Sequence, residues 1–197
     1  KAVEIGNGLV PTYFTHEAVD FEPVVDENGE PVISHYGLQK AKVKAFKAVP
    51  LPYFLEGPAR MMGYVDVDTA RDMFDKVKKT DLYDKKLAMY KTSASIEGCS
   101  MENGRCRAFT PGWQERENVF LHMEYKYILA MLKAGLYDEY YDTITRALIP
   151  FLDPNMYGRS TLENSSFLAS SANPNPDVHG RGFVARLSGS TTEMISM

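Results

Sequence analysis

The sequence predicts a mainly α-helical fold behind a β-rich N-terminal segment, residues 1–60. Two observations support this prediction: the first 60 residues carry short β-prone runs and weak helix signals, and apolar residues recur at helical spacing from Asp66 onwards. With 197 residues, 44% of them hydrophobic, the chain can bury one sizeable core. We therefore expect residues 61–197 to form one domain around that core and residues 1–60 to form a β-rich addition to it.

Within the β-rich segment, the pattern predicts a hairpin-like turn and a strand. The run 26–31 is rich in turn-forming residues and lies between short β-prone runs. Residues 42–49 alternate polar and apolar side chains, which is typical of a strand with one face on a core. Pro50 and Pro52 then end the strand.

Three helices are expected in the larger part. The first is amphipathic and follows a cap at Asp66 or Asp68. The second starts after residues 112–118 and runs to about Ala134. It is apolar almost all round, so we expect it to be buried between other helices. Gly135 stops it, and a third helix follows at once to make an antiparallel helical hairpin.

Residues 150–188 are rich in Pro, Asn, Ser and Gly, and we expect them to be irregular. Long irregular loops in compact domains are often functional. Residues 157–166 are dense in hydrogen-bonding groups that suit sugar hydroxyls. Beyond the loop, Ser190 and Glu193 have capping-box spacing, which indicates a further helix start.

Composition and charge exclude several classes of partner. The net charge is −4 with both signs mixed along the chain, so no basic face is available for a nucleic acid or an anionic membrane. No apolar run is long enough to span a bilayer, which predicts a soluble chain. Cys99 and Cys106 are expected to be free thiols rather than a local disulfide, and no pattern indicates a metal site. Because the chain begins at Lys1 and stops just after an apparent helix start, we interpret it as a fragment.

Three segments of the larger part, in this order, resemble a known family: Arg116–His122, Tyr157–Glu163 and Leu187–Ser190. Together they resemble the closing half of glycoside hydrolase family 94, which contains the cellobiose and chitobiose phosphorylases. They look closest to the 1,2-β-oligoglucan phosphorylases. The resemblance covers about residues 65–197.

The resemblance implies a partial (α/α)6 toroid, of which this chain supplies the C-terminal half. It also implies an inverting glycoside phosphorylase that cleaves β-linked gluco-oligosaccharides with inorganic phosphate and releases a sugar 1-phosphate. Phosphate is then a co-substrate, and no cofactor is implied. Members of the family are often cytoplasmic homodimers, so the expected partners are an oligosaccharide, phosphate and a second copy of the chain.

The resemblance assigns phosphate binding to His122 and to the hydroxyl-glycine pair Ser188-Gly189, in which serine replaces the usual threonine. The chemistry agrees with this assignment, because phosphate is best held by a few directed donors and a backbone N–H at a helix start adds partial positive charge. An imidazolium at His122 would donate a further hydrogen bond. The alternative for His122 is a core histidine whose ring is satisfied by a backbone carbonyl.

Candidate sugar-binding residues come from the first two segments. In the first, counting back from His122 matches Glu115 to the family's sugar-binding acid, whereas the triplet of Arg116, Glu117 and Asn118 favours Glu117. The alternative for Glu115, Arg116 and Glu117 is a solvated first helical turn. In the second segment the candidates are Tyr157, Arg159 and Glu163.

The family's general acid is an aspartate in a Trp-Asn-Asp-like segment, and it protonates the departing glycosidic oxygen. This chain has one tryptophan and no such segment, so we expect the acid to lie outside the chain and the chain alone to be inactive. Two other functions stay open. One is an inverting hydrolase in which Glu163, otherwise a loop cap, activates water as the base. The other is a non-catalytic carbohydrate-binding module with a shallow aromatic platform.

Overall fold

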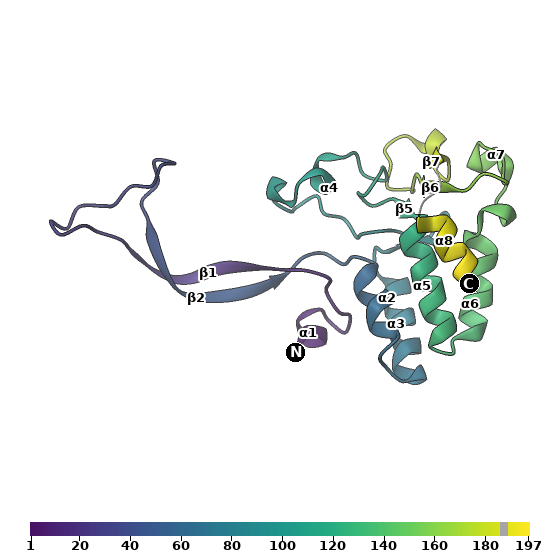
Figure 1. The fold of residues 1–197 in the computed structure, drawn as a ribbon, viewed down its shortest axis with the longest axis horizontal. Coiled ribbons are helices and arrows are strands. Elements are labelled where there is room, and N and C mark those ends of the chain that lie inside the picture. Colours follow the sequence, from purple (N-terminus) through teal and green to yellow (C-terminus); the bar gives the residue numbers. More distant parts are fainter. Residues whose placement is uncertain (186–188) are drawn as a thin grey trace. The chain divides into compact units, whose positions relative to one another are not determined.

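The computed structural model of the chain describes residues 1–185 and 189–197. Their contacts group into two compact units. Residues 13–51 form one, which we call the hairpin unit, and residues 1–12 with 52–197 form the other, which we call the main unit. Each unit is described by itself (Figure 1).

The hairpin unit is an antiparallel ribbon of β1 (Phe14–Pro23) and β2 (Ala41–Pro50), with a register irregularity after Ala18. The turn predicted at residues 26–31 is present, closed by a hydrogen bond from the Asp26 amide to the Glu30 carbonyl. The predicted strand is also confirmed. Its side chains are largely exposed, however, because a two-stranded ribbon has no third layer to cover either face. The prediction that one face of this strand lies on a core was therefore wrong.

The first predicted helix of the main unit is confirmed as α3 (Val67–Lys79). Asp66 caps it, and its carboxylate accepts a hydrogen bond from the Thr69 amide at 2.9 Å. The apolar face of α3 is buried, as the helical spacing predicts. Two further helices precede it, α1 (Ala2–Ile5) and α2 (Glu56–Met62).

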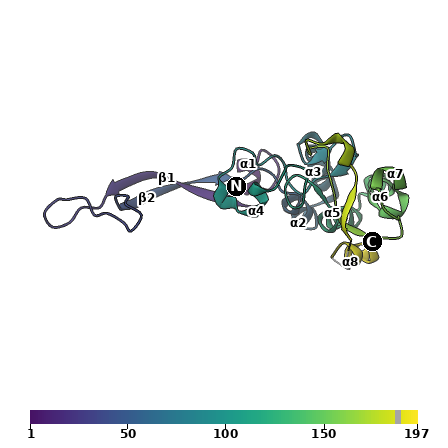
Figure 2. The same ribbon diagram turned by 90° about the horizontal axis from the view of Figure 1, so that it is seen from above.

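Helix α5 (Leu121–Lys133) is the central element of the main unit, in contact with α2, with α6 (Tyr137–Ala147) and with α8 (Gly189–Ser196). Figures 1 and 2 show α8 beside α5. Gly135 reverses the chain between α5 and α6 with a φ of 83°, so the predicted helical hairpin is confirmed. Both sides of α5 are buried, as expected for a helix that is apolar almost all round.

A three-stranded antiparallel sheet lies against α5, with the strand order β5 (Val119–Phe120), β6 (Ser165–Leu168) and β7 (Gly182–Ala185). Its register places Phe120, Phe167 and Phe183 opposite one another, and their rings stack in a row. The other short elements are β3 (Tyr83–Asp84), β4 (Met89–Tyr90), the 3-10 turn Met101–Asn103, α4 (Arg105–Ala108), the 3-10 turn Ile149–Phe151, α7 (Pro154–Tyr157) and the 3-10 turn Pro176–Val178.

The predicted fold class, mainly α with a partial (α/α)6 toroid, was wrong. Helices hold 38% of the residues and strands 21%, and the described part of the chain contains three small antiparallel sheets. The fold is therefore mixed α and β. Two strands, β6 and β7, lie in the stretch 150–188 that was expected to be irregular. No helix within the described residues is both long enough and apolar enough to cross a bilayer.

Candidate functional site

The β5-β6-β7 sheet brings together the three segments that carry the family resemblance. In its antiparallel register, the end of β5 at Phe120, the start of β6 at Ser165 and the end of β7 at Ala185 lie at the same end of the sheet. His122 comes two residues after the end of β5, and Glu163 comes two residues before the start of β6. The sheet therefore gathers segments that are far apart in the sequence.

His122 and Gly189 are in direct contact at this end of the sheet. A Cβ atom added at Gly189 would overlap the imidazole ring of His122 at its Nδ1 and Cε1 atoms. Gly189 is the first residue of α8, so its backbone N–H belongs to the first turn of a helix. Two of the three residues predicted to bind phosphate thus lie together, and the third, Ser188, is outside the described residues.

The start of α8 is tied to the sheet by side-chain hydrogen bonds. The Asn164 amide donates to the hydroxyls of Ser190 at 3.4 Å and Thr191 at 3.1 Å, and the Ser190 hydroxyl donates to the Ser165 carbonyl at 3.4 Å. Ser190 is the second residue of the helix, so the expected capping box of Ser190 and Glu193 was wrong. Glu193 has a different contact.

Glu193 on α8 lies near two basic side chains of α5, His122 and Lys126. Its Oε1 atom lies 3.3 Å from Nε2 of His122 and 4.0 Å from Nζ of Lys126. The Glu193 side chain is 18% exposed. Lys126, Glu193 and Glu56 also line a cavity of about 370 Å³ between α2, α5 and α8, whereas His122 does not.

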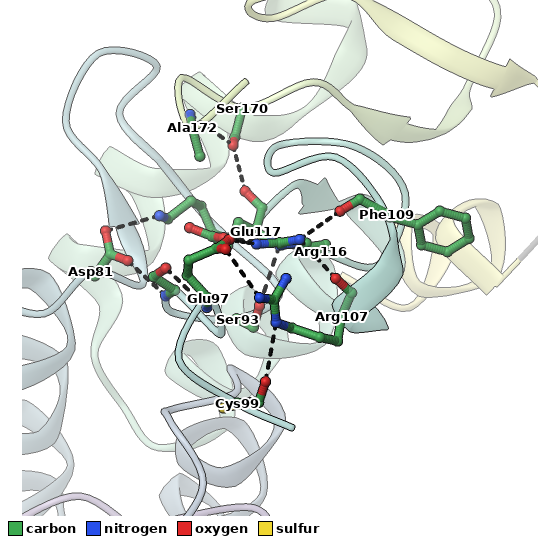
Figure 3. A network of polar contacts seen from close by, with 12 residues as sticks. Asp81, Ser93, Glu97, Cys99, Arg107, Phe109, Arg116, Glu117, Ser170 and Ala172 are labelled. Carbon is green, nitrogen blue, oxygen red and sulfur yellow. Dashed lines mark hydrogen bonds and ion pairs between the residues drawn. The ribbon is translucent and has the colours of Figure 1, made fainter. Parts of the chain in front are cut away.

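Arg116 is the centre of a buried polar network (Figure 3). Its Nη1 atom donates to the carbonyls of Arg107 at 2.7 Å and Phe109 at 2.8 Å, and its Nη2 atom forms an ion pair with Glu97. Arg107 donates to the other oxygen of Glu97 at 3.0 Å. The expectation of a solvated charge at Arg116 does not match this buried position.

Glu117 is buried beside Arg116 in a strained backbone conformation, with a φ of 55°. Its Oε2 atom lies 3.6 Å from Nε of Arg116 and has no hydrogen-bond partner among the described residues. Burial raises the pKa of the Glu117 carboxyl, and the nearby ammonium of Lys91 opposes part of that rise. Glu115, by contrast, is partly exposed and pairs with Arg105 at 2.9 Å. The assignment of the sugar-binding acid to either residue stays a prediction.

The three candidate sugar-binding residues of the segment Tyr157–Glu163 lie in different surroundings. Tyr157 is fully buried, and its hydroxyl donates to the Glu163 carbonyl at 2.5 Å and contacts the Ser165 hydroxyl at 2.7 Å. Its ring therefore packs in the core and supports the loop. Arg159 donates two hydrogen bonds of 3.1 Å, one to each carboxylate oxygen of Glu163. This bidentate pair is at the surface.

Two features of this region were missed by sequence reasoning. One is the contact of Glu193 with His122. The sequence contains no sign of it, because the spacing of Ser190 and Glu193 was interpreted as a capping box. The other is the row of stacked rings from Trp113 through Phe183 and Phe167 to Phe120. Cys99 and Cys106 are free, as predicted, and the described part of the chain holds no cluster of three or more His, Cys, Asp and Glu side chains that could bind a metal.

A scan against models of known protein families finds no match to this chain, and a search of curated proteins finds none either.

Proposed function

We propose that this chain is part of an inverting glycoside phosphorylase and that His122 and the start of α8 bind the inorganic phosphate. The observation that carries the proposal is the contact between His122 and Gly189 at the end of the β5-β6-β7 sheet. The oligosaccharide would be β-linked and glucose-based, and the product a sugar 1-phosphate. These substrates follow from the resemblance of the three segments to glycoside hydrolase family 94.

The physical chemistry of the contact suits an oxyanion. A helix start offers backbone N–H groups that lack partners within the helix, together with partial positive charge. The face of the His122 imidazole ring packs against Gly189, and the ring nitrogens can add a donor beside the helix start. Because Gly189 has no side chain, the ring and the helix start approach closely enough for one oxyanion to contact both.

The hydrolase alternative requires Glu163 to act as a base that activates water. Both of its carboxylate oxygens accept hydrogen bonds from Arg159 in a pair at the surface, so the carboxylate is engaged as one half of an ion pair. This engagement supports the phosphorolysis proposal over hydrolysis. In the enzyme that contains this chain, a sugar 1-phosphate should form only when phosphate is present. Release of free sugar at an unchanged rate without phosphate would contradict the proposal.

Replacement of His122 by asparagine is expected to weaken phosphate binding by about tenfold or more, because a charge-assisted donor contributes about 1.5–3 kcal/mol. Binding of a gluco-oligosaccharide should change far less. Calorimetric titration of the chain with inorganic phosphate and with the oligosaccharide measures both effects. His16→Asn, in the hairpin unit, is the matched control. Equal losses for the two ligands would remove His122 from the phosphate site.

Replacement of Gly189 by alanine is expected to weaken phosphate binding by a similar factor, because the added methyl group would displace the imidazole ring. Gly98→Ala is the control, since a Cβ atom at Gly98 meets no described atom within 4 Å. The same phosphate titration compares the two variants. Undiminished affinity in Gly189→Ala would show that phosphate does not bind beside the contact of His122 with α8.

A further inference from the structure

We propose that the cavity between α2, α5 and α8 is a carbohydrate site, which holds the oligosaccharide beside the phosphate. This inference rests on the proposed function and adds to it the place where the sugar binds. Neither the resemblance nor the sequence pattern assigns the lining residues of this cavity to sugar binding. The cavity has a volume of about 370 Å³, which lies in the range of roughly 300–1,000 Å³ typical of pockets for small molecules.

The position of the cavity suits a reaction with phosphate. Glu193 lines the cavity and lies 3.3 Å from Nε2 of His122. Met123, which also lines it, directly follows His122 on α5. One end of the cavity is therefore next to the proposed phosphate site. In phosphorolysis a phosphate oxygen must approach the anomeric carbon of the sugar to about 3–3.5 Å, and a sugar at this end of the cavity can lie within that reach.

The cavity is extended along α5. The residues that α5 contributes run from Met123 to Lys133 at helical spacing, so they lie on one face of the helix. They span about 15 Å, because an α-helix rises 1.5 Å per residue. On the other side, α2 contributes Glu56 and Arg60, which are one turn apart. This length suits a chain of sugar rings better than it suits a single ion.

The charged groups of the cavity favour a neutral ligand with many hydroxyls. Arg60 donates to Oε1 of Glu56 at 3.3 Å. Nζ of Lys126 lies 4.0 Å from Oε1 of Glu193, and Lys133 forms no ion pair within the described part of the chain. An anion in the cavity would be repelled by both carboxylates, whereas a sugar hydroxyl can donate to a carboxylate and accept from a lysine or arginine. Such hydrogen bonds to charged groups are stronger than those between neutral groups.

The cavity also offers apolar surface for the faces of sugar rings. Met123 and Leu129 of α5 line it with aliphatic side chains. Tyr64, just after α2, lines it with an aromatic ring, and this residue is 86% exposed. A tyrosine combines a large apolar ring with a polar hydroxyl, so it can pack against a sugar ring and hydrogen-bond to it. The lining therefore provides both kinds of contact that a sugar makes.

The test uses two variants of exposed lining residues, Tyr64→Ala and Lys133→Met. Each has a matched control outside the cavity lining. Tyr137→Ala removes a tyrosine of α6 that is 60% exposed, and Lys79→Met removes the last residue of α3, as Lys133 is the last of α5. Calorimetry measures the affinity of each protein for a 1,2-β-linked glucose trisaccharide and for inorganic phosphate. Thermal unfolding should be unchanged in all four variants, which confirms that they are folded.

We expect Tyr64→Ala and Lys133→Met each to lose about tenfold in affinity for the trisaccharide and to keep their phosphate affinity within about twofold. The two controls should stay within about twofold for both ligands. Unchanged trisaccharide affinity in both cavity variants, or no binding of the trisaccharide by the unsubstituted chain, would overturn the inference. A loss of phosphate affinity alone in Lys133→Met would also overturn it, because the cavity would then hold an anion.

The place of binding is measured by titrating the 15N-labelled chain with the same trisaccharide. The amides of Gly63 and Ala130, two residues of the cavity lining, should shift in a saturable way, whereas the amide of Gly98 should not. Saturable shifts that leave Gly63 and Ala130 unchanged would place the sugar elsewhere and overturn the inference. If the chain binds the trisaccharide in the cavity but binds no phosphate, the proposed function fails and the carbohydrate site is supported.

Discussion

Replacement of Arg116 by methionine is expected to destabilise the main unit by about 3–5 kcal/mol, the range found when one partner of a buried ion pair is removed. Methionine has no charge and no donor, so the carbonyls of Arg107 and Phe109 lose their hydrogen bonds. Glu117 would also be left buried without the guanidinium that lies 3.6 Å from its Oε2 atom. Urea unfolding followed by the fluorescence of Trp113, the one tryptophan of the chain, measures the change.

Arg105→Met is the matched control for this prediction. Arg105 also pairs with a carboxylate, that of Glu115 at 2.9 Å, but its side chain is 75% exposed, so its loss should change the free energy of unfolding by less than about 1 kcal/mol. Similar free energies of unfolding for Arg116→Met and Arg105→Met would mean that the network around Arg116 does not stabilise the fold.

Replacement of Glu124 by glutamine is expected to stabilise the main unit in a pH-dependent way. Glu124 lies fully buried on α5, with Oε1 accepting a hydrogen bond from the Tyr90 amide at 2.9 Å and Oε2 without a partner among the described residues. Burial raises the pKa of this carboxyl to about 8, and the charge of Asp84 adds to the rise. Glutamine keeps the acceptor for Tyr90 and cannot ionise.

The direction of this pH dependence follows from the raised pKa of Glu124 in the folded state. Below the pKa of 4.5 expected for the unfolded chain, Glu124 is protonated in both states, and the two proteins should have the same stability. As the pH rises from 4.5 to 8, the free energy of unfolding of the unsubstituted chain falls by up to about 1.4 kcal/mol per pH unit relative to that of Glu124→Gln. Above pH 8 the difference in free energy between the two proteins is constant.

Denaturant unfolding of both proteins at a series of pH values measures this difference. Glu102→Gln is the control, because Glu102 is exposed and should give no such trend. A stability difference that stays constant from pH 4 to pH 9 would contradict a buried, neutral Glu124.

Helices α3, α5 and α6 could be predicted because the helical period repeats in each of them. Helix α3 has two local signals, an Asp66 cap and an apolar stripe of Ala70, Met73, Phe74 and Val77. Both are present in the structure. The strands β5 to β7 could not be found in this way. All four residues of β6 are buried and two of them are serines, so no alternation of polar and apolar residues shows. Their pairing depends on the fold as a whole.

The candidate site was predictable only in part, for a similar reason. His122 and Gly189 were chosen by resemblance, and their contact depends on the sheet that joins β5 to β7. Tyr157 was chosen as a residue that could face a sugar, but its hydroxyl is used within the loop and its ring within the core. The contact of Glu193 with His122 needs the packing of α8 on α5, which no local pattern describes.

The central claim is that phosphate binds beside the contact of His122 with the start of α8, where it can reach both. Titration of the 15N-labelled chain with inorganic phosphate tests it most directly, by following the backbone amides and the histidine ring nitrogens. The account predicts saturable shifts at the Gly189 and Ser190 amides and at the His122 ring, with no change at Gly29 in the hairpin unit. Shifts elsewhere that leave these three groups unchanged, or no saturable shift at all, would contradict it.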